Sequence, residues 1–293
     1  MISAVVVTFN KLELLKECIE AIKKQSILPD RIIIVDNNST DGTKEFLIEE
    51  ATNDQLIVPL LLEENIGGAG GFNRGIKKAM EYRSDFVWVM DDDTIPSVTA
   101  LENLIKAKNE IGKDNFSFLA SNVRWIDGKA CLMNVPRVLQ DWNNTNFVEL
   151  EFSSFVSMFI NAECIKEVGY PISDFFIWGD DVEYAKRLRQ SAPGYYVFDS
   201  IVIHKMAQNT RTDILVDSAQ RIPRYFYSMR NVTYIARKDG KKEFMKHFLN
   251  KYLWINLKIC FSKTDHKLKK LGIWNKGFWK GLFFNPVVEK YEE

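Results

Sequence analysis

Short apolar runs and helical patterns alternate along the first part of the chain. Residues 4–9 form a mainly apolar run, and apolar residues then recur at helical spacing at Leu12, Leu15, Ile19 and Ile22. A run that is apolar on both faces predicts a buried strand, whereas spacings of three and four residues predict an amphipathic helix. The chain is therefore predicted to begin with a strand followed by a helix.

The same combination recurs further along the chain. Strand-like runs cover residues 31–35, 56–62 and 86–90, and residues 44–50 have a helical pattern. Strands that are apolar on both faces and alternate with helices are typical of a sheet that helices cover on both sides. We therefore predict an α/β fold with a mostly parallel sheet flanked by helices.

The pattern is less regular in the middle of the chain. Strand-like runs lie at residues 116–123 and 155–161, and helical patterns lie at residues 162–168 and 180–190. We expect these elements to complete a first domain over residues 1–222.

From Pro223 onward aromatic and basic residues predominate, which predicts a separate helical segment over residues 223–293. Between Arg237 and Lys280 there are 13 Lys or Arg residues against three acidic residues, a net charge of +10. Aromatic and cationic side chains together suit a helix at an anionic membrane surface. A helical cap that packs on the first domain or on a second subunit of a homo-oligomer is an equal alternative. The interleaved large apolar residues are Phe226, Tyr227, Tyr234, Tyr252, Leu253, Trp254, Ile255, Leu257, Trp274, Phe278, Trp279, Phe283 and Phe284.

Size and overall charge bound the class of protein. The chain has 293 residues, of which 46% are hydrophobic and 27% charged, enough to bury one core with an appendage or two small cores. Lys plus Arg and Asp plus Glu are equal at 39 each, so overall charge gives no sign of a nucleic-acid partner, and we expect none.

Cysteine usage and hydropathy indicate a cytoplasmic protein. The cysteines are widely spaced, form no C-x-x-C pair and are all expected to be buried thiols in a reducing compartment. The N-terminus lacks the features of a signal peptide, and no apolar run is long enough to cross a bilayer. We expect a protein that is soluble or attached peripherally to the inner face of the cell membrane. The four cysteines are Cys18, Cys131, Cys164 and Cys260.

Polar clusters follow three of the predicted strands. They are Thr-Phe-Asn at residues 8–10, Asp-Asn at residues 36–37 and three aspartates at residues 91–93. In parallel sheets, ligands bind beyond the carboxyl ends of the strands. We therefore expect the functional site at this edge.

The three consecutive aspartates concentrate negative charge at the end of a buried strand. Because alternate residues of an extended segment point the same way, Asp91 and Asp93 can face one ion while Asp92 faces a ribose or sugar hydroxyl. Carboxylates suit Mg²⁺ or Mn²⁺, which neutralises a diphosphate leaving group. The alternative is an acidic surface turn that caps the helix near Ser97, and the apolar strand before the triplet favours the metal site.

A second acidic pair at residues 180–181, Asp-Asp, follows the segment Phe-Phe-Ile-Trp-Gly. Aromatic neighbours desolvate a carboxylate and raise its pKa, which favours a general base for a sugar hydroxyl. Capping of the following helix is compatible with that role. Glu183 and Arg187 lie four residues apart and are expected to form an ion pair on this helix.

The histidines separate into one candidate ligand and two surface residues. His204 follows a short apolar run and is a candidate third metal ligand, although a lone histidine after a strand is more often structural. His247 and His266 lie in the basic segment and are expected to be solvated.

Residues 65–75 form a glycine-rich loop that opens a helix. Backbone amides of such a loop can approach phosphate, which makes Asn65 and Gly68 candidate contacts. The loop lacks the glycine and the lysine that the dinucleotide-binding and P-loop fingerprints require, so both classes of enzyme are disfavoured. Arg74 is a candidate phosphate partner, with an ion pair on the helix surface as the alternative.

Taken in order, these motifs resemble those of family 2 glycosyltransferases over about residues 3–205. The glycine-rich loop together with the three aspartates is most similar to the galactofuranosyltransferases, and the rhamnosyltransferase-like group is next. The motifs are Val-Val-Val-Thr-Phe-Asn, Ile-Val-Asp-Asn-Asn-Ser-Thr-Asp-Gly-Thr, Asn-Ile-Gly-Gly-Ala-Gly-Gly-Phe, Met-Asp-Asp-Asp and Trp-Gly-Asp-Asp-Val-Glu-Tyr.

The resemblance implies a GT-A fold, a nucleoside-diphosphate sugar donor and inversion of the anomeric centre in one displacement. It implies that Thr8, Asn10 and Asp36 line a uridine or deoxythymidine pocket, with Arg74 nearby and Asp92 on the donor. It also implies that Asp91 and Asp93 hold a divalent metal, Mn²⁺ or Mg²⁺. His204 matches a late metal-ligand histidine of galactofuranosyltransferases and would join them.

The acidic pair acquires roles from the same resemblance. Asp181 matches the second acid of the family's pair and is the implied catalytic base, with Asp180 beside it. Trp178 and Gly179 would shape the acceptor site. The Gly-Asp-Asp sequence matches the galactofuranosyl type, whereas other members have Glu-Asp before this helix.

The implied activity is transfer of galactofuranose from UDP-galactofuranose to a lipid-linked or oligosaccharide acceptor in bacterial surface polysaccharide synthesis. The alternative donor is dTDP-rhamnose. A sugar nucleotidyltransferase is disfavoured, because Thr-Phe-Asn-Lys at residues 8–11 replaces the glycine-rich basic loop of those enzymes. A non-catalytic carbohydrate- or lipid-binding protein on the same scaffold is an alternative of another class. Asp181 argues against it, since a binding module needs no base.

Overall fold

The computed structural model describes residues 1–139 and 145–292, which divide into two compact units. The first unit contains Met1–Ser173, Asp181–Thr210 and the C-terminal residues from Val288, and the second contains Asp174–Asp180 and Arg211–Val287. The second unit therefore starts before the boundary expected at residue 222. The reason is that Ile214, ahead of that boundary, is buried in the core of the second unit.

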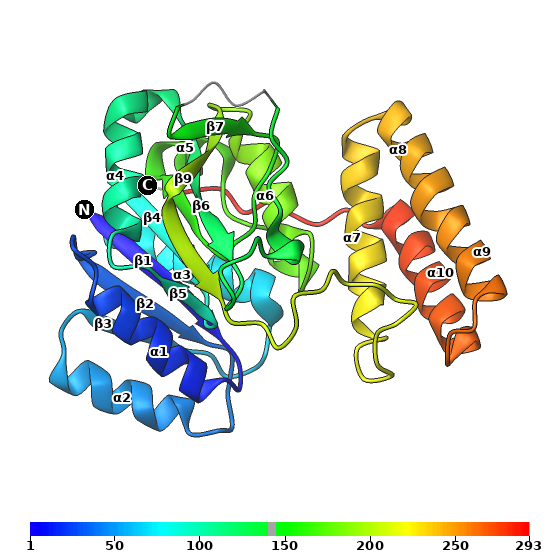
Figure 1. Ribbon diagram of the computed structural model, residues 1–293, viewed down its shortest axis with the longest axis horizontal. Helices are drawn as coiled ribbons and strands as arrows, with labels where there is room; N and C mark the ends of the chain where they lie inside the picture. Colours follow the sequence, from blue (N-terminus) through cyan, green and yellow to red (C-terminus); the bar gives the residue numbers. More distant parts are fainter. Residues whose placement is uncertain (140–144, 293) are drawn as a thin grey trace. The chain divides into compact units, whose positions relative to one another are not determined.

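The first four strands of the first unit form a parallel half-sheet. In the order β3 (Ile57–Leu61), β2 (Arg31–Asp36), β1 (Ile2–Thr8) and β4 (Phe86–Asp91), each strand pairs in parallel with its neighbour. All four correspond to apolar runs in the sequence. Their carboxyl ends share one edge, as the pattern predicted (Figure 1).

The remaining strands make the sheet mixed. Four of the eight pairings among the described strands are antiparallel, so the mostly parallel arrangement holds only for the first half. The chain returns along the sheet in β8, which lies antiparallel between β4 and β6. The predicted α/β class is confirmed. These strands are β5 (Thr94–Pro96), β6 (Phe118–Arg124), β7 (Phe147–Leu150), β8 (Met158–Asn161) and β9 (Gly194–His204).

Helices cover both faces of this sheet, and alternation along the strands creates two cores. On β1, Val5 and Val7 lie in one core, whereas Ala4 and Val6 lie in the other. Helix α3 contributes Phe72 to the first core, and α1 contributes residues such as Leu15 to the second. The helices of this unit are α1 (Leu12–Lys23), α2 (Thr43–Asn53), α3 (Gly67–Glu81), α4 (Ala100–Ile111), α5 (Ala162–Val168) and α6 (Asp180–Leu188), of which the first residue belongs to the second unit.

The C-terminal tail packs on the first unit. The Glu289 carboxylate pairs with Lys77 and accepts a hydrogen bond from Asn73 Nδ2 at 3.1 Å. The Glu289 carbonyl accepts the backbone N–H of Tyr170 at 2.9 Å. The end of the chain is therefore held by α3 and by the segment after α5.

The second unit is helical, as the composition predicted. It contains α7 (Arg224–Lys238), α8 (Lys241–His247), the π-helical turn η4 (Phe248–Leu253), α9 (Trp254–Phe261) and α10 (Lys267–Phe283). A Cβ on Gly277 would lie 2.7 Å from the Phe226 carbonyl oxygen, and one on Gly281 would lie 2.7 Å from the Arg230 carbonyl oxygen. These glycines let α10 pack closely on α7.

Two expectations about this region are wrong. His247 is buried rather than solvated, and its Nε2 lies 3.0 Å from Thr233 Oγ1. Burial, with the nearby charge of Lys251, lowers the pKa of His247 to about 4. Cys260 is exposed, whereas the other three cysteines are buried as expected. In both cases burial depends on which side of its helix the residue lies, and composition does not reveal that side.

Candidate active site

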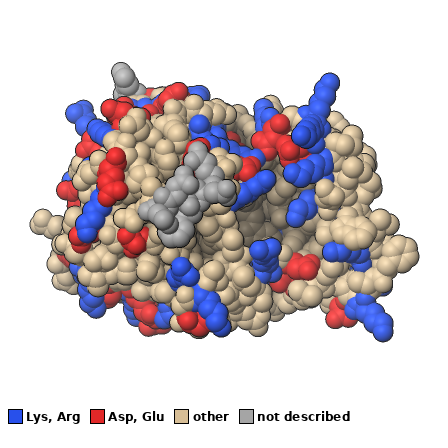
Figure 2. Space-filling model, turned by 45° about the horizontal axis from the view of Figure 1, so that its top comes forward, with Lys and Arg blue, Asp and Glu red and all other residues tan. Residues whose placement is uncertain are grey.

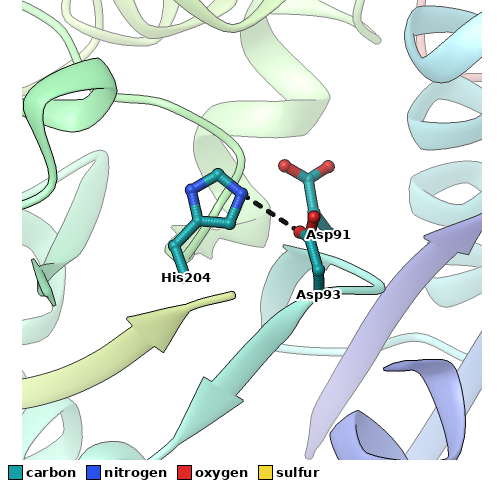
Figure 3. Close-up of side chains that lie close together, drawn as sticks. All are labelled: Asp91, Asp93 and His204. Carbon is teal, nitrogen blue, oxygen red and sulfur yellow. Dashed lines mark ion pairs between the residues drawn. The ribbon is translucent and has the colours of Figure 1, made fainter. Parts of the chain in front are cut away.

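Three side chains at the carboxyl edge of the sheet form one cluster. Asp91 ends β4, Asp93 follows two residues later, and His204 ends β9. One ligand atom from each lies within 4.8 Å of the others (Figure 3). The pairing of β5 with β9 places Thr94 directly opposite His204, which brings a histidine far along the chain beside Asp93. The structure thus assembles the three residues that the sequence proposed as metal ligands.

The chemistry of this cluster fits a divalent cation. Asp93 and His204 are both buried, and Asp93 Oδ1 lies 3.0 Å from His204 Nε2. That oxygen forms an ion pair with the imidazole but no hydrogen bond in good geometry, so a cation could replace its partner. Two carboxylates and one imidazole are suitable ligands for Mn²⁺ or Mg²⁺.

The three groups are strongly coupled electrostatically. Burial and the charge of Asp93 raise the pKa of Asp91 to about 7. Burial alone would lower the pKa of His204, but Asp93, Cys131 and Asp91 raise it to about 10. Burial opposes ionisation of Asp93 too, yet His204 and Lys11 hold its pKa well below the usual range. The cluster therefore carries protons that a bound cation would replace.

Lys11 belongs to the site, although sequence analysis gave it no role there. Its Nζ lies 3.0 Å from Asp92 Oδ1 and 2.8 Å from Asp93 Oδ2. The aspartates raise its pKa despite partial burial. Asp92 also accepts a 2.9 Å hydrogen bond from Thr8 Oγ1. Its position in the sequence could have revealed this role, because Lys11 follows the polar cluster after β1 just as the aspartates follow β4.

Asn134 lies behind His204 and is a second residue that sequence analysis missed. Its Oδ1 lies 2.9 Å from His204 Nδ1, and its Nδ2 donates to Ser154 Oγ at 2.9 Å. The bond to Ser154 fixes which way the amide points, so His204 Nδ1 carries the proton and Nε2 faces the carboxylates. Cys131 Sγ donates to the same Asn134 oxygen at 3.1 Å.

The loops proposed for the nucleoside lie beside this cluster. Thr8 and Asp36 are neighbours in the register of β1 and β2, and both are buried. Asn10, with a positive φ of 54°, accepts a 2.8 Å hydrogen bond from the backbone N–H of Thr40, which ties the two loops together. Asn37 belongs to the polar cluster predicted at this edge but was given no role of its own, and its buried Oδ1 has no hydrogen-bond partner among the described residues.

The acidic pair lies at the start of α6. Asp180 is the last residue of a second-unit segment, and Asp181 is the first residue after the return to the first unit. Burial raises the pKa of Asp181 to about 6, although the Val182 backbone N–H at 2.7 Å opposes the shift. The predicted ion pair is confirmed, because Arg187 Nε lies 2.8 Å from Glu183 Oε1. A carboxylate with this pKa is suited to accept a proton near neutral pH.

Comparison with known proteins shows what part of this chain is similar to. Residues 3–129 match the family model described as Glycosyl transferase family 2. This part of the chain is similar to a family 2 glycosyl transferase domain. Both aspartates of the cluster, Asp91 and Asp93, lie inside the matched segment.

Relatives extend the similarity beyond the matched segment. The chain is 26% identical over 293 aligned positions to galactofuranosyltransferase GlfT1 of Mycobacterium tuberculosis, covering 92% of this chain and 91% of the relative. It is 24% identical to GlfT1 of Mycolicibacterium smegmatis, covering 87% and 89%. It is also 32% identical to the Campylobacter jejuni GalNAc(5)-diNAcBac-PP-undecaprenol beta-1,3-glucosyltransferase, over 37% of this chain and 35% of that one.

Solved structures support the GT-A fold. Staphylococcus aureus TarS 1–349 aligns with a TM-score of 0.61 and 17% identity over 94% of this chain and 80% of its own. The chain covers 48% of the longer TarS chain. GalNAc-T7, solved with UDP, GalNAc and Mn²⁺, aligns with a TM-score of 0.62 and 16% identity over 94% of this chain and 55% of its own.

The glycine-rich loop of the transferase domain has two roles. A Cβ on Gly71 would lie 2.5 Å from Val7 Cγ1, and one on Gly75 would lie 2.4 Å from Val5 Cγ1, so these glycines let α3 pack on β1. A Cβ on Gly68 would meet no described atom within 4 Å, which leaves space at the start of α3. Asn65 Oδ1 accepts the Gly67 N–H at 2.9 Å, and Arg74 is exposed on the same helix.

The segment before the acidic pair has an unusual backbone. Phe176 and Trp178 have positive φ angles of 63° and 66°, which are costly for residues with side chains. Within the second unit, the buried Asn231 Nδ2 donates to the Trp178 carbonyl at 2.8 Å and to the Phe175 carbonyl at 2.9 Å. Asn231 thus holds the segment that contains Trp178 and Gly179, the residues predicted to contact the acceptor.

Proposed function

We propose that the protein is an inverting glycosyltransferase that moves galactofuranose from UDP-galactofuranose to a carbohydrate acceptor. The observation that carries this proposal is the cluster of Asp91, Asp93 and His204 beside the loops of Thr8 and Asp36. Two GlfT1 relatives of nearly the same length support the choice of sugar. The alternative donor, dTDP-rhamnose, would use the same cluster.

The donor would bind along the carboxyl edge of the sheet. Asp91, Asp93 and His204 would hold Mn²⁺ or Mg²⁺, which supplies positive charge for the diphosphate leaving group. The nucleoside would lie against Thr8, Asn10 and Asp36, which end or follow β1 and β2. Asn65 and Gly68 would face the phosphates, because α3 begins there. Arg74, which lies further along α3 and is exposed, would be a phosphate partner through its long side chain.

Asp181 would act on the acceptor. With a pKa of about 6, its carboxylate is ionised at neutral pH and can take the proton from the attacking hydroxyl. Attack at the anomeric carbon opposite the diphosphate inverts the configuration without a covalent intermediate. Asp180, Trp178 and Gly179 would orient the acceptor, and Asn231 would fix the backbone that presents them.

We further propose that the acceptor is a lipid-linked or oligosaccharide chain and that the protein attaches peripherally to the inner face of the cell membrane. The Campylobacter jejuni relative is named for an undecaprenol-linked acceptor. Among the described residues, no helix has the length and apolar character needed to span a bilayer.

A donor panel tests the proposal. Purified protein with Mn²⁺ is incubated with UDP-galactofuranose, UDP-galactopyranose, UDP-glucose and dTDP-rhamnose, and with lipid-linked galactan or oligosaccharide acceptors. We expect transfer from UDP-galactofuranose that chelation of the metal abolishes. Transfer from dTDP-rhamnose alone would replace the proposed sugar. Metal-dependent donor binding without turnover of any donor would favour a non-catalytic binding protein.

A further inference from the structure

The helix formed by α8, η4 and α9 has a buried apolar side and an exposed apolar side. These elements follow one another without a break as one rod (Figure 1). One side packs into the core of the second unit, where the Tyr252 ring lies 3.8 Å from the Phe278 ring and Ile259 is fully buried. A helix with only this partner needs one apolar side. Its other side therefore requires a separate explanation.

That other side carries a stripe of exposed apolar side chains. Five of them recur every fourth residue, and between 38% and 85% of each residue in the stripe is exposed. Exposed apolar residues scattered singly are ordinary, whereas a continuous exposed stripe marks a binding surface. The lipid-facing stripe, as we name it, consists of Met245, Leu249, Leu253, Trp254, Leu257 and Phe261.

The π-helical turn keeps this stripe on one side of the rod. In an α-helix, a spacing of four residues advances about 40° beyond a full turn at each step. A π-helical turn holds more residues, so the same spacing falls short of a full turn there. Because η4 covers Phe248–Leu253, the step from Leu249 to Leu253 turns the stripe back around the helix axis, against the direction in which the steps on either side turn it. An uninterrupted α-helix would spread the same five residues over about 160° of its circumference.

Positive charge surrounds the stripe. Residues 241–261 contain a single acidic residue, Glu243. The Lys258 ammonium group lies 5.5 Å from the centre of the Trp254 ring, so the stripe and the charge are adjacent. In Figure 2, blue side chains border a largely tan surface at the right-hand end, which contains these helices. The exposed lysines of the rod are Lys241, Lys242, Lys246, Lys251 and Lys258.

We propose that the lipid-facing stripe lies on an anionic lipid surface, with these lysines at the phosphate headgroups. An amphipathic helix of this kind binds parallel to the surface, with its apolar side among the acyl chains. A symmetric contact with a second copy would instead place the same lysines against one another, which like-charge repulsion opposes. The inference deepens the proposed function and rests on it, since a lipid-linked acceptor lies at such a surface.

Vesicle co-sedimentation of the full chain tests this inference. We compare phosphatidylcholine vesicles with vesicles in which about a third of the lipid is anionic phosphatidylglycerol, a charge density that attracts basic helices. The test variant is Leu249→Glu/Leu257→Glu. The matched control is Ile48→Glu/Val98→Glu, which changes two comparably exposed residues of the first unit. Donor hydrolysis and sedimentation velocity are measured on each preparation.

We expect the wild type and the control to bind the anionic vesicles, and the stripe variant to bind at least about tenfold more weakly. Equal binding by the two variants would overturn the inference. So would a wild-type dimer that the stripe variant dissociates without loss of vesicle binding, since the stripe would then be a subunit interface. Donor hydrolysis distinguishes the two proposals. Hydrolysis without vesicle binding contradicts only this inference, and vesicle binding without any donor turnover contradicts only the proposed function.

Discussion

Each unit of the protein contains groups whose environment is energetically unfavourable. In the first unit these groups are charged and buried, and in the second they are apolar and exposed. The first unit buries charge, since Asp92, Asp93 and His204 are each less than 10% exposed at the edge of its sheet. The helical unit instead exposes apolar surface, with Phe261 85% exposed. Burying charge and exposing apolar surface are both costly in a folded protein. Each arrangement therefore indicates where a ligand would relieve the cost, a cation in the first unit and an apolar surface in the second.

The supporting contacts of the two regions differ in the same way. In the first unit, Lys11 and Asn134 hold the acidic and imidazole groups through hydrogen bonds and ion pairs. In the second unit, stacked rings such as Tyr252 and Phe278 hold the rod. Polar substitutions should thus act mainly on ligand binding and catalysis in the first unit. Truncation of buried rings should act mainly on stability in the second.

Loss of the proposed base should have the largest effect. Asp181→Asn keeps the shape of the side chain but cannot accept a proton, so kcat/KM for sugar transfer should fall by about 10²–10⁴-fold. Metal affinity, measured by isothermal titration calorimetry with Mn²⁺, should not change. Asp174→Asn, an exposed acid in the same stretch of sequence, is the matched control. Full transfer activity in Asp181→Asn would remove this residue from the mechanism.

Truncation of a buried ring in the helical unit should have the next largest effect. Phe278 is 2% exposed, so Phe278→Ala should lower the free energy of unfolding of this unit by about 3–5 kcal/mol. Phe283 is 83% exposed, so Phe283→Ala should change it by less than about 0.5 kcal/mol. Chemical denaturation followed by circular dichroism measures both. Equal losses would mean that Phe283 is covered in solution.

Substitution of Asn134 should weaken metal binding without touching a metal ligand. Asn134→Leu removes the acceptor for His204 Nδ1–H, and the Kd for Mn²⁺ should rise by about 10–100-fold. Asn134→Asp keeps an acceptor and should bind Mn²⁺ nearly as well as the wild type. Calorimetry on the purified variants measures both values without any sugar donor. If both variants bind like the wild type, Asn134 does not position His204.

The pH dependence should show the smallest but most specific effect. Asp181 must be ionised to act, so kcat/KM should fall about tenfold per pH unit below its pKa of about 6. Because its pKa is higher in the folded protein than in the unfolded chain, Asp181 favours folding when it is protonated. This contribution to the free energy of unfolding is complete below the ordinary pKa of an aspartate and is lost as the pH rises through about 6. At about pH 8, Asp181→Asn should therefore raise Tm, by about 2–4 °C for each kcal/mol recovered. An acid limb that persists in Asp181→Asn would assign the titration to another group.

Much of the first unit could be predicted because its signals are local. The four strands that form the parallel half-sheet are continuous apolar runs, and the aspartates stand directly after one of them. β5 has only three residues, which is too short for an apolar pattern to reveal. Its pairing with β9 nevertheless brings His204 to Asp93. The sequence therefore supplied all three candidate ligands, and the resemblance added support for the histidine.

The missed residues share a dependence on distant partners. Lys11 and Asn134 are ordinary polar residues in their local sequence, and each acquires a role from a group more than 60 positions away. Asn231 is similar, because its position in α7 says nothing of the strained segment it holds. His247 was mistaken for a surface residue since a basic composition does not show which side of a helix faces inward. Tertiary packing determines all four.

The return of the C-terminal tail to the first unit affects how truncated forms should be interpreted. Glu289 contacts Lys77 and Tyr170, whereas the helical unit ends at Val287. A premature stop codon anywhere in residues 211–287 therefore removes this tail together with part of the helical unit. A phenotype of such an allele reports the loss of both. An internal deletion within residues 211–287 instead keeps the last residues available to the domain that binds them.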